Sequence, residues 1–299
     1  MFSPNCLPIL IGSLPLEDHA EAVDLIFEHT PEIPLWPQLP KHKKEGMVRQ
    51  FASGFPGLID RGSSCWIDRE KDSFISEMTS FYEHVIECQT LPVLPHDSIF
   101  ALGDDTARGF SVFKERLETT RCSPLTVKGQ VTGPVTAGIG IKDRQGVPLV
   151  YDDDLRDMLI KLLAGKARWQ IEQFRPFCTD VPPIIFIDEP GIVNFGSTAF
   201  AGVSRELVLD GVLELIGAIR DAGGLSGLHI CANGDWEPAL SSETDIISFD
   251  GYSYFDNFAL YREQLVSYLE RGGILAWGIV PTSPPDRVCL LYTSDAADE

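Results

Sequence analysis

Short, almost wholly apolar segments alternate with longer amphipathic ones along most of this chain, and this alternation limits the possible folds more than any other feature. The apolar segments are nearly continuous rather than alternating, as in PPIIFIDEPG at 182–191, which is almost wholly apolar and ends in two carboxylates. Strands with this pattern are buried on both faces, which is typical of parallel sheets covered by helices. The predicted strands are 7–12, 32–40, 125–136, 182–191, 227–231, 245–250 and 273–281.

Amphipathic segments with helical spacing separate these strands. The longest, 152–174, begins with three aspartates, which the helix dipole favours at an amino terminus. Seven strands with intervening helices predict an α/β fold, namely a (β/α)8 TIM barrel truncated before its last strand–helix unit. The segment 55–72 is expected to lie outside the repeat. The other predicted helices are 16–30, 72–89, 204–224, 235–241 and 256–271.

Length and composition suit one domain. The chain has 299 residues, of which 44% are hydrophobic, as expected for a single barrel over residues 1–288. The final segment CLLYTSDAADE, at 289–299, breaks the pattern and resembles a translated sequencing adaptor. We therefore expect a non-native tail, with the natural protein continuing beyond Val288.

Charge, hydropathy and cysteine content argue against several classes of partner. Asp and Glu number 44 against 24 Lys and Arg, and the net charge of -20 disfavours nucleic acid and anionic membranes. No apolar run reaches the roughly 18 to 20 residues that span a bilayer, and the N-terminus lacks a signal-peptide pattern. Seven scattered cysteines are typical of a reduced protein, which predicts a cytoplasmic location.

Polar side chains gather where the predicted strands end, which is where parallel barrels hold their active sites. Asp188 and Glu189 end one strand. His229 and Cys231, two residues apart on the next strand, share a face, and imidazole and thiolate are ligands that suit zinc. Asp250, after the following strand, would supply a third ligand and leave one position open. The residues alone are equally compatible with a packing role for His229 and Cys231.

Five motifs in this order resemble the catalytic barrel of cobalamin-independent methionine synthase. The resemblance extends to the superfamily that includes uroporphyrinogen decarboxylase and the corrinoid:thiol methyltransferases, and it covers roughly residues 7–282. It implies a zinc ion bound by His229 and Cys231, with Asp250 where the family usually has Glu. The motifs are IGSLP (11–15), VKGQVTGPVT (127–136), FIDEPG (186–191), HIC (229–231) and DIISFD (245–250).

The resemblance also implies roles for substrate-binding residues. Gly12 and Ser13 would hold a substrate carboxylate, and Asp188 would contact the substrate amine, with Glu189 beside it as a second catalytic carboxyl group. Lys41 stands where the family has an amine-binding Glu, and GIVPTSPP at 278–285 lacks the family's His. The implied activity is thiol methylation by a zinc-dependent methyltransferase, with homocysteine or another small thiol as acceptor and a methylcorrinoid or methylfolate as donor.

Two other functions remain open. One is a uroporphyrinogen decarboxylase-like enzyme without a metal, although the chain shows no arginine cluster near its N-terminus. The other is a non-catalytic barrel that binds a small molecule and partners a corrinoid protein. Zinc content and turnover distinguish the three.

Overall fold

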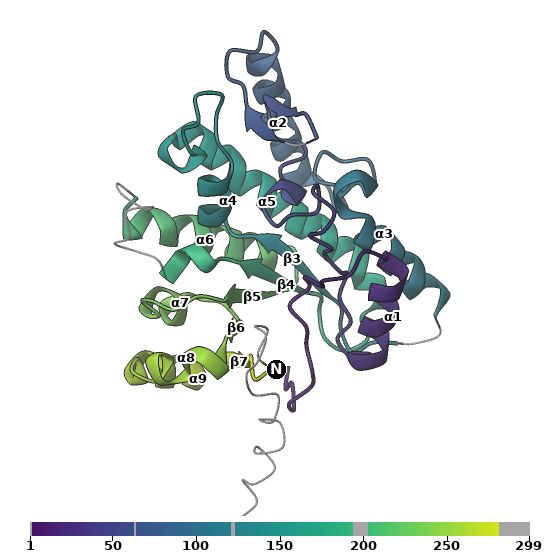
Figure 1. Cartoon of the computed structure of the whole chain (residues 1–299), viewed down its shortest axis with the longest axis vertical. Coiled ribbons are helices and arrows are strands. Elements are labelled where there is room, and N and C mark those ends of the chain that lie inside the picture. Colours follow the sequence, from purple (N-terminus) through teal and green to yellow (C-terminus); the bar gives the residue numbers. More distant parts are fainter. Residues whose placement is uncertain (1, 63, 121–122, 194–202, 281–299) are drawn as a thin grey trace, which may run out of the picture.

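A five-stranded parallel sheet forms the centre of the molecule in the computed structural model, which describes residues 2–62, 64–120, 123–193 and 203–280 (Figure 1). The strands lie side by side in chain order, and helices connect each pair, so the predicted α/β class is confirmed. The strands are β3 (Lys128–Thr132), β4 (Ile184–Asp188), β5 (Leu225–Ile230), β6 (Ile246–Phe249) and β7 (Ile274–Trp277).

Two predicted strands, 7–12 and 32–40, are extended segments that continue the sheet beyond β3. Leu35 on the second segment forms an isolated parallel bridge with Lys128 of β3. A further parallel bridge joins Ser13, directly after the segment 7–12, to Gln38 of the second segment, and no residue of 7–12 itself belongs to a strand. Both segments contain prolines, which have no N–H to donate, and this explains why single bridges replace a regular ladder.

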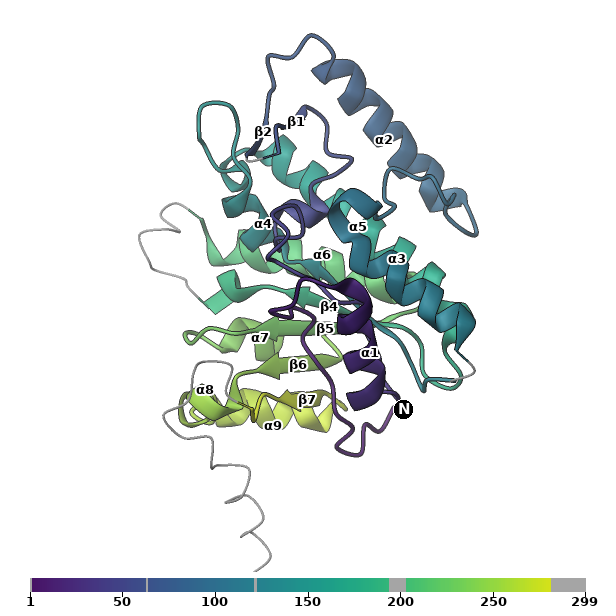
Figure 2. The same ribbon diagram turned by 45° about the vertical axis from the view of Figure 1, so that its right-hand side comes forward.

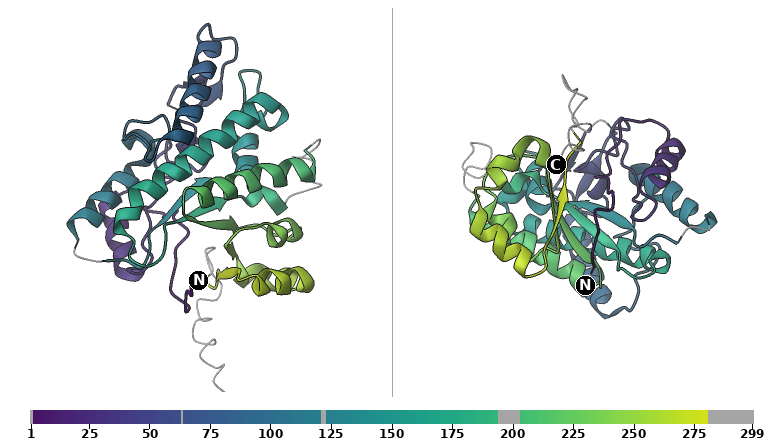
Figure 3. Two further views of the ribbon diagram at one scale, coloured as in Figure 1. Left: turned by 180° about the vertical axis from the view of Figure 1, so that it is seen from behind. Right: turned by 90° about the horizontal axis from the view of Figure 1, so that it is seen from below.

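Helices α5 and α6 lie side by side along one face of the sheet (Figures 1 and 3). Helix α5 begins where the side chain of Asp152 accepts a hydrogen bond from Leu155 N at 3.0 Å. The same capping by Asp18 starts α1. The helices around the sheet are α1 (His19–His29), α3 (Asp104–Thr119), α4 (Pro134–Gly140), α5 (Asp153–Phe174), α6 (Arg205–Asp221), α7 (Glu237–Ser241), α8 (Gly251–Phe258) and α9 (Arg262–Glu270).

Several elements differ from the predictions. The sequence predicted a strand up to residue 136, but β3 ends at Thr132 and α4 begins at Pro134, because proline fits the first helical turn. The predicted helix 256–271 is divided into α8 and α9. Helix α3 was not predicted. The tail at 289–299 and the last residue of the predicted strand 273–281 lie outside the described residues.

The segment 55–72 forms an antiparallel hairpin of β1 (Leu58–Asp60) and β2 (Cys65–Ile67), outside the main sheet as predicted. Helix α2 (Phe74–Thr90) follows it and lies at the upper end of the molecule in Figure 2. No helix of the described ranges is long and apolar enough to cross a membrane.

The two faces of the sheet pack differently. Val131, Ile187 and Leu228 belong to the main core together with the helices. Alternate residues of the same strands point to the opposite face, here called the inner face. Its apolar cluster consists of Ile33, Ile184, Phe186 and Ile246, against which Phe2, Leu7, Ile9, Leu225, Ile274 and Ala276 pack. The N-terminal segment and β7 therefore contribute to one apolar cluster.

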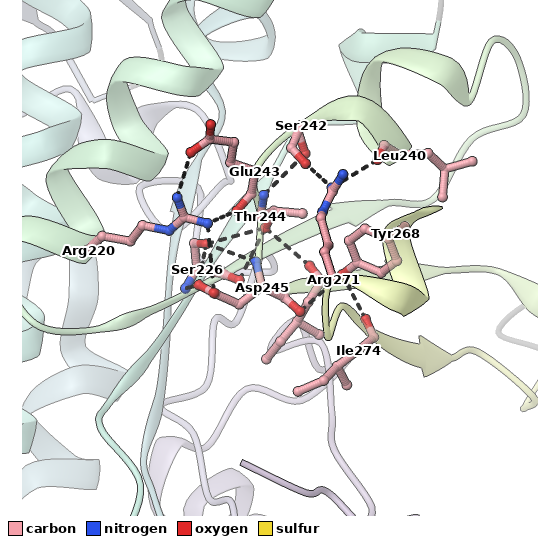
Figure 4. A network of polar contacts seen from close by, with 11 residues as sticks. Arg220, Ser226, Leu240, Ser242, Glu243, Thr244, Asp245, Tyr268, Arg271 and Ile274 are labelled. Carbon is pink, nitrogen blue, oxygen red and sulfur yellow. Dashed lines mark hydrogen bonds and ion pairs between the residues drawn. The ribbon is translucent and has the colours of Figure 1, made fainter. Parts of the chain in front are cut away.

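A polar network joins β5, β6 and β7 at their amino-terminal ends (Figure 4). The backbone N and the hydroxyl group of Ser226 both donate to Asp245 Oδ2, at 2.8 and 2.7 Å. The Tyr268 hydroxyl lies 3.0 Å from the carbonyl oxygens of both Asp245 and Ile274. Arg271 donates to two carbonyl groups at the end of α7. These contacts hold the three strands together at the edge opposite the predicted site.

Candidate functional site

One row of polar residues crosses the carboxyl-terminal edge of the sheet. Thr132, Asp188, His229 and Ser248 are register partners on β3, β4, β5 and β6. Register partners in a parallel sheet point to the same face, so all four side chains belong to the inner face. The structure thus brings the predicted residues Asp188 and His229 onto neighbouring strands, side by side.

Asp188 is a buried carboxyl group, and its Oδ1 has no hydrogen-bond partner among the described residues. Burial raises its pKa to about 7, and the positive charge of Lys128 opposes this shift. Lys128 is also buried; it donates to Ile11 O, and its Nζ lies 4.8 Å from the centre of the Phe186 ring. Burial lowers the pKa of Lys128 to about 8, against the effect of Asp188.

His229 is held by its neighbour on β6. Its Nδ1 lies 3.1 Å from Ser248 Oγ, which leaves Nε2 as the nitrogen for a metal or a ligand. Burial lowers the His229 pKa to about 4; Lys128 acts in the same direction and Asp250 opposes it. The imidazole is therefore neutral at physiological pH, which is the form that binds metals.

Cys231 follows β5 as an exposed free thiol. Partial burial of the sulfur raises its pKa, and the carboxylates of Asp188 and Asp250 act in the same direction. The thiol is therefore protonated without a cation beside it.

Asp250, the predicted third ligand, caps helix α8. Its Oδ1 accepts a hydrogen bond from Ser253 N at 2.9 Å. In the part of the chain that the structure describes, no three or more His, Cys, Asp or Glu side chains form a group that could hold a metal ion. The donor types of His229, Cys231 and Asp250 suit zinc by their chemistry, but the structure does not bring these three side chains together as a ligand group.

Glu189, predicted as a catalytic carboxyl group, is directed to the start of α4. It accepts hydrogen bonds from Val135 N at 2.8 Å, Thr136 N at 3.0 Å and Gly191 N at 3.1 Å, and also from the Thr136 hydroxyl. Burial raises its pKa to about 7, and these hydrogen bonds oppose the shift. Its carboxylate is occupied with helix donors, in contrast to Asp188.

The predicted substrate-binding residues lie in different environments. Gly12 is buried with φ 138°, and Ser13 beside it is exposed. A Cβ at Gly12 would lie 3.3 Å from the side-chain amide of Gln130. Lys41 is an exposed residue whose ammonium pairs with Glu17 at 3.2 Å.

Gln130 is a residue that the sequence analysis missed. It lies on the inner face of β3 between Lys128 and Thr132, and its side chain is buried. Its Nε2 donates to Trp36 O at 3.0 Å, and its Oε1 has no partner among the described residues. The alternation of residues along VKGQVTG could have revealed Gln130. This alternation puts the polar side chains of Lys128, Gln130 and Thr132 on one face of the strand.

Two hollows lie away from these residues. One, of about 610 Å³, lies on the outer surface among α2, α5 and α6, where Val93, Arg168 and Glu214 contribute to its lining. The other, of about 600 Å³, lies near the amino-terminal ends of the strands, beside Phe2 and Leu225. Neither is lined by the predicted site residues.

Comparison with known proteins assigns no family. The sequence matches no protein-family model and no curated protein.

Proposed function

We propose that the protein is a zinc-dependent methyltransferase that activates a small thiol for methyl transfer. The observation that carries this proposal is an imidazole held by a neighbouring hydroxyl group near the end of β5, with a free exposed thiol two residues further along the chain. Ser248 fixes the His229 ring through Nδ1, and Cys231 follows two residues later as an exposed thiol. In proteins, a hydrogen bond to the ring nitrogen that does not bind the metal orients a metal-binding histidine.

The architecture that we propose is a (β/α)8 barrel. Isolated parallel bridges link Ser13 to Gln38 and Leu35 to Lys128 of β3, so the extended segments near residues 13 and 35–38 would continue the five strands to seven in chain order. The inner apolar cluster unites side chains from the N-terminal segment and from β7, as the interior of a closing sheet does. In such a fold the row containing Asp188 and His229 opens onto the catalytic face.

The residues present suit zinc by their chemistry. His229 is neutral, and Cys231 is free to lose its proton when a cation binds. Asp250 retains one carboxylate oxygen beyond the one that caps α8. A bound zinc ion would hold the substrate thiol as a thiolate, which is the nucleophilic form.

The remaining inner-face groups would bind and orient the substrate. The unpartnered Oδ1 of Asp188 can accept a hydrogen bond from a substrate N–H, and Lys128 balances its charge within the protein. Gly12 and Ser13 lie at the end of the first extended segment, where backbone groups can approach a substrate closely. Positioning of the two reactants supplies much of the rate in reactions of this kind.

Zinc content tests the proposal directly. We expect about one zinc ion per chain for the full-length protein, and loss of the metal in His229→Ala and Cys231→Ala. Cys6→Ser is the matched control, since Cys6 is also an exposed free cysteine but lies in the N-terminal segment. Full zinc occupancy in Cys231→Ala would contradict the assignment.

Turnover provides the second test. The zinc-loaded protein should methylate homocysteine or another small thiol with methylcobalamin or methyltetrahydrofolate as donor. Decarboxylation of a porphyrinogen by metal-free protein would instead support the decarboxylase. Binding of a corrinoid protein and a thiol without methyl transfer would support the non-catalytic barrel.

A further inference from the structure

Exposed apolar side chains are concentrated at the β7 end of the sheet, where α8, α9 and β7 form the lower end in Figures 1 and 2. Of the eighteen exposed large apolar residues in the described ranges, eight lie within residues 251–280. An apolar surface of this kind is typical of a contact with another protein. The eight residues are Tyr252, Phe255, Leu260, Val266, Leu269, Trp277, Ile279 and Val280.

The same segment is nearly neutral, although the whole chain is strongly acidic. Two arginines, Arg262 and Arg271, stand against three acids, Asp256, Glu263 and Glu270, which gives a net charge of -1 compared with -20 for the chain. Two copies of an acidic protein repel each other over most of their surfaces. A neutral apolar surface is the part through which they can approach, whereas a basic partner would be attracted to the acidic remainder.

Strand β7 is an open edge of the sheet among the described residues. The backbone N–H groups of Ile274 and Gly278 donate toward β6, each at 2.9 Å. Backbone groups alternate between the two sides of a strand, so Leu275 and Trp277 direct their N–H and C=O groups to the open edge. No described residue bonds to them there. An unpaired edge of this kind is a template for a further strand.

A second copy can pair with this edge through a two-fold axis that passes through Ala276, perpendicular to the sheet. Leu275 of one copy then lies opposite Trp277 of the other, and each such antiparallel pair exchanges two N–H···O hydrogen bonds. The rotation generates this pair twice, so every outward backbone group of Leu275 and Trp277 is bonded. The two Ala276 residues, which have the smallest side chain on β7, meet at the axis.

Helix α9 lies near the same axis. A helix rises about 1.5 Å per residue and a strand about 3.3 Å, so Val266 and Ala276 are at similar distances from the turn between α9 and β7. The rotation therefore sets the two α9 helices antiparallel, with Val266 close to the axis. It also places Arg262 of each copy opposite Glu270 of the other, because each is four residues from Val266.

The exposed face of α9 suits this arrangement. Arg262, Val266, Leu269 and Glu270 follow helical spacing and are all exposed, so two apolar side chains lie between two opposite charges. Within the described ranges, neither Arg262 nor Glu270 has an ion-pair partner in its own chain. The second copy would supply that partner at both ends of the contact.

We propose that two copies of this chain form a dimer in which the β7 strands join the two sheets and the α9 helices pack against each other. The inference does not depend on the proposed function, and it concerns the chain of 299 residues. An eighth strand in a longer protein would occupy the same edge and exclude the second copy. A two-fold contact closes on itself, so the assembly ends at the dimer.

Sedimentation equilibrium of the full chain over a range of concentrations tests the proposal. We expect a monomer–dimer equilibrium that reaches twice the chain mass of 33.0 kDa, without larger species. Leu275→Pro removes an outward N–H group and leaves the bonds to β6 in place, so this variant should be monomeric. Circular dichroism checks that the variant is folded.

Charge reversal on α9 tests the contact without changing β7. Glu270→Arg sets two arginines against each other and should weaken the dimer about tenfold. Adding Arg262→Glu to that variant restores opposite charges and should restore the affinity. Glu115→Arg, at an exposed position on α3, changes the net charge of the chain equally and is the matched control. It should not weaken the dimer.

Four results would overturn the proposal. A wild-type monomer at all concentrations would show that the β7 edge is covered within one chain. A dimer that survives both Leu275→Pro and Glu270→Arg would place the contact elsewhere. Species larger than a dimer would exclude a two-fold contact, and a charge swap that fails to restore the affinity would exclude the antiparallel arrangement of α9.

Discussion

Lys128 on β3 and Asp188 on β4 form a pair of opposite charge on the inner face, and each favours the charged form of the other. Both side chains are buried. Two charges removed from water in this way depend on each other, since the loss of one leaves the other uncompensated.

A double-mutant cycle should detect this dependence. We expect Lys128→Met and Asp188→Asn each to reduce the free energy of unfolding, by about 3 kcal/mol for the lysine variant. The double variant should be more stable than the sum of the two losses predicts. Urea unfolding at neutral pH gives the free energy of unfolding of the wild type, both single variants and the double variant. Strictly additive losses would show that the pair is uncoupled.

Lys166 on α5 provides a prediction about pH. It is fully buried, its Nζ has no partner among the described residues, and burial lowers its pKa to about 7 from 10.5. Between these pH values the unfolded chain binds the proton and the folded chain does not, so stability rises with pH across this window. The slope from this group approaches about 1.4 kcal/mol per pH unit.

Lys166→Met should abolish that contribution. The variant should be more stable than the wild type at neutral pH, because methionine fills a similar volume without a charge to desolvate. Denaturant unfolding at several pH values above neutral gives the slope of the free energy of unfolding against pH for the wild type and for the variant. Lys128, whose pKa is also lowered, contributes equally to the slope of each protein. Parallel curves for wild type and variant would refute the prediction.

Glu189 should matter for the stability of α4. Glu189→Gln replaces one carboxylate oxygen with an NH2 group, which must then face N–H donors of the helix start. We expect a loss of about 1 to 3 kcal/mol in the free energy of unfolding. Glu115→Gln, at an exposed position on α3, is the control and should change stability by less than about 0.5 kcal/mol. Equal behaviour of the two variants would exclude the capping role.

Ser248 should influence metal affinity without being a ligand. Ser248→Ala removes the contact to His229 Nδ1 and frees the ring to rotate. If His229 binds zinc, competition with a chelator should show an affinity about 10- to 100-fold weaker. The control is Ser242→Ala, whose hydroxyl donates to Ala239 O at the end of α7. An unchanged zinc affinity in Ser248→Ala would mean that this hydrogen bond has no role in metal binding.

The buried strands could be predicted from the sequence because their apolar runs are long and are bounded by turns. Strands β3, β4, β6 and β7 lie within predicted segments, whereas β5 begins two residues before its predicted segment 227–231. Asp188 and His229 lie at the carboxyl ends of β4 and β5 as expected. Helix α3 was not predicted. It is kinked at Ala107, whose φ of -146° and ψ of 49° are not helical, and this kink interrupts the regular helical spacing of apolar residues.

The candidate site was less predictable because its hydrogen bonds join distant parts of the chain. The side-chain amide of Gln130 donates to Trp36 O, 94 residues away, and the Gln130 backbone bonds to the side chain of Gln170, 40 residues away. Local patterns give no information about such partners. The motif around Glu189 likewise indicated a carboxyl group at a strand end but not its direction toward α4.

The network in Figure 4 makes the two ends of the sheet unequal in their tolerance of mutation. Ser226, Asp245 and Tyr268 join the strands at one end, whereas Thr132 and Cys231 stand at the other. Randomised libraries at exposed carboxyl-end positions such as Cys231, with Asp188 and Glu189 left unchanged, should therefore yield many folded variants with altered ligand preference. Libraries at the amino ends should yield few folded proteins of any kind. New specificities can therefore arise in this chain while the network at the amino-terminal ends of the strands stays unchanged.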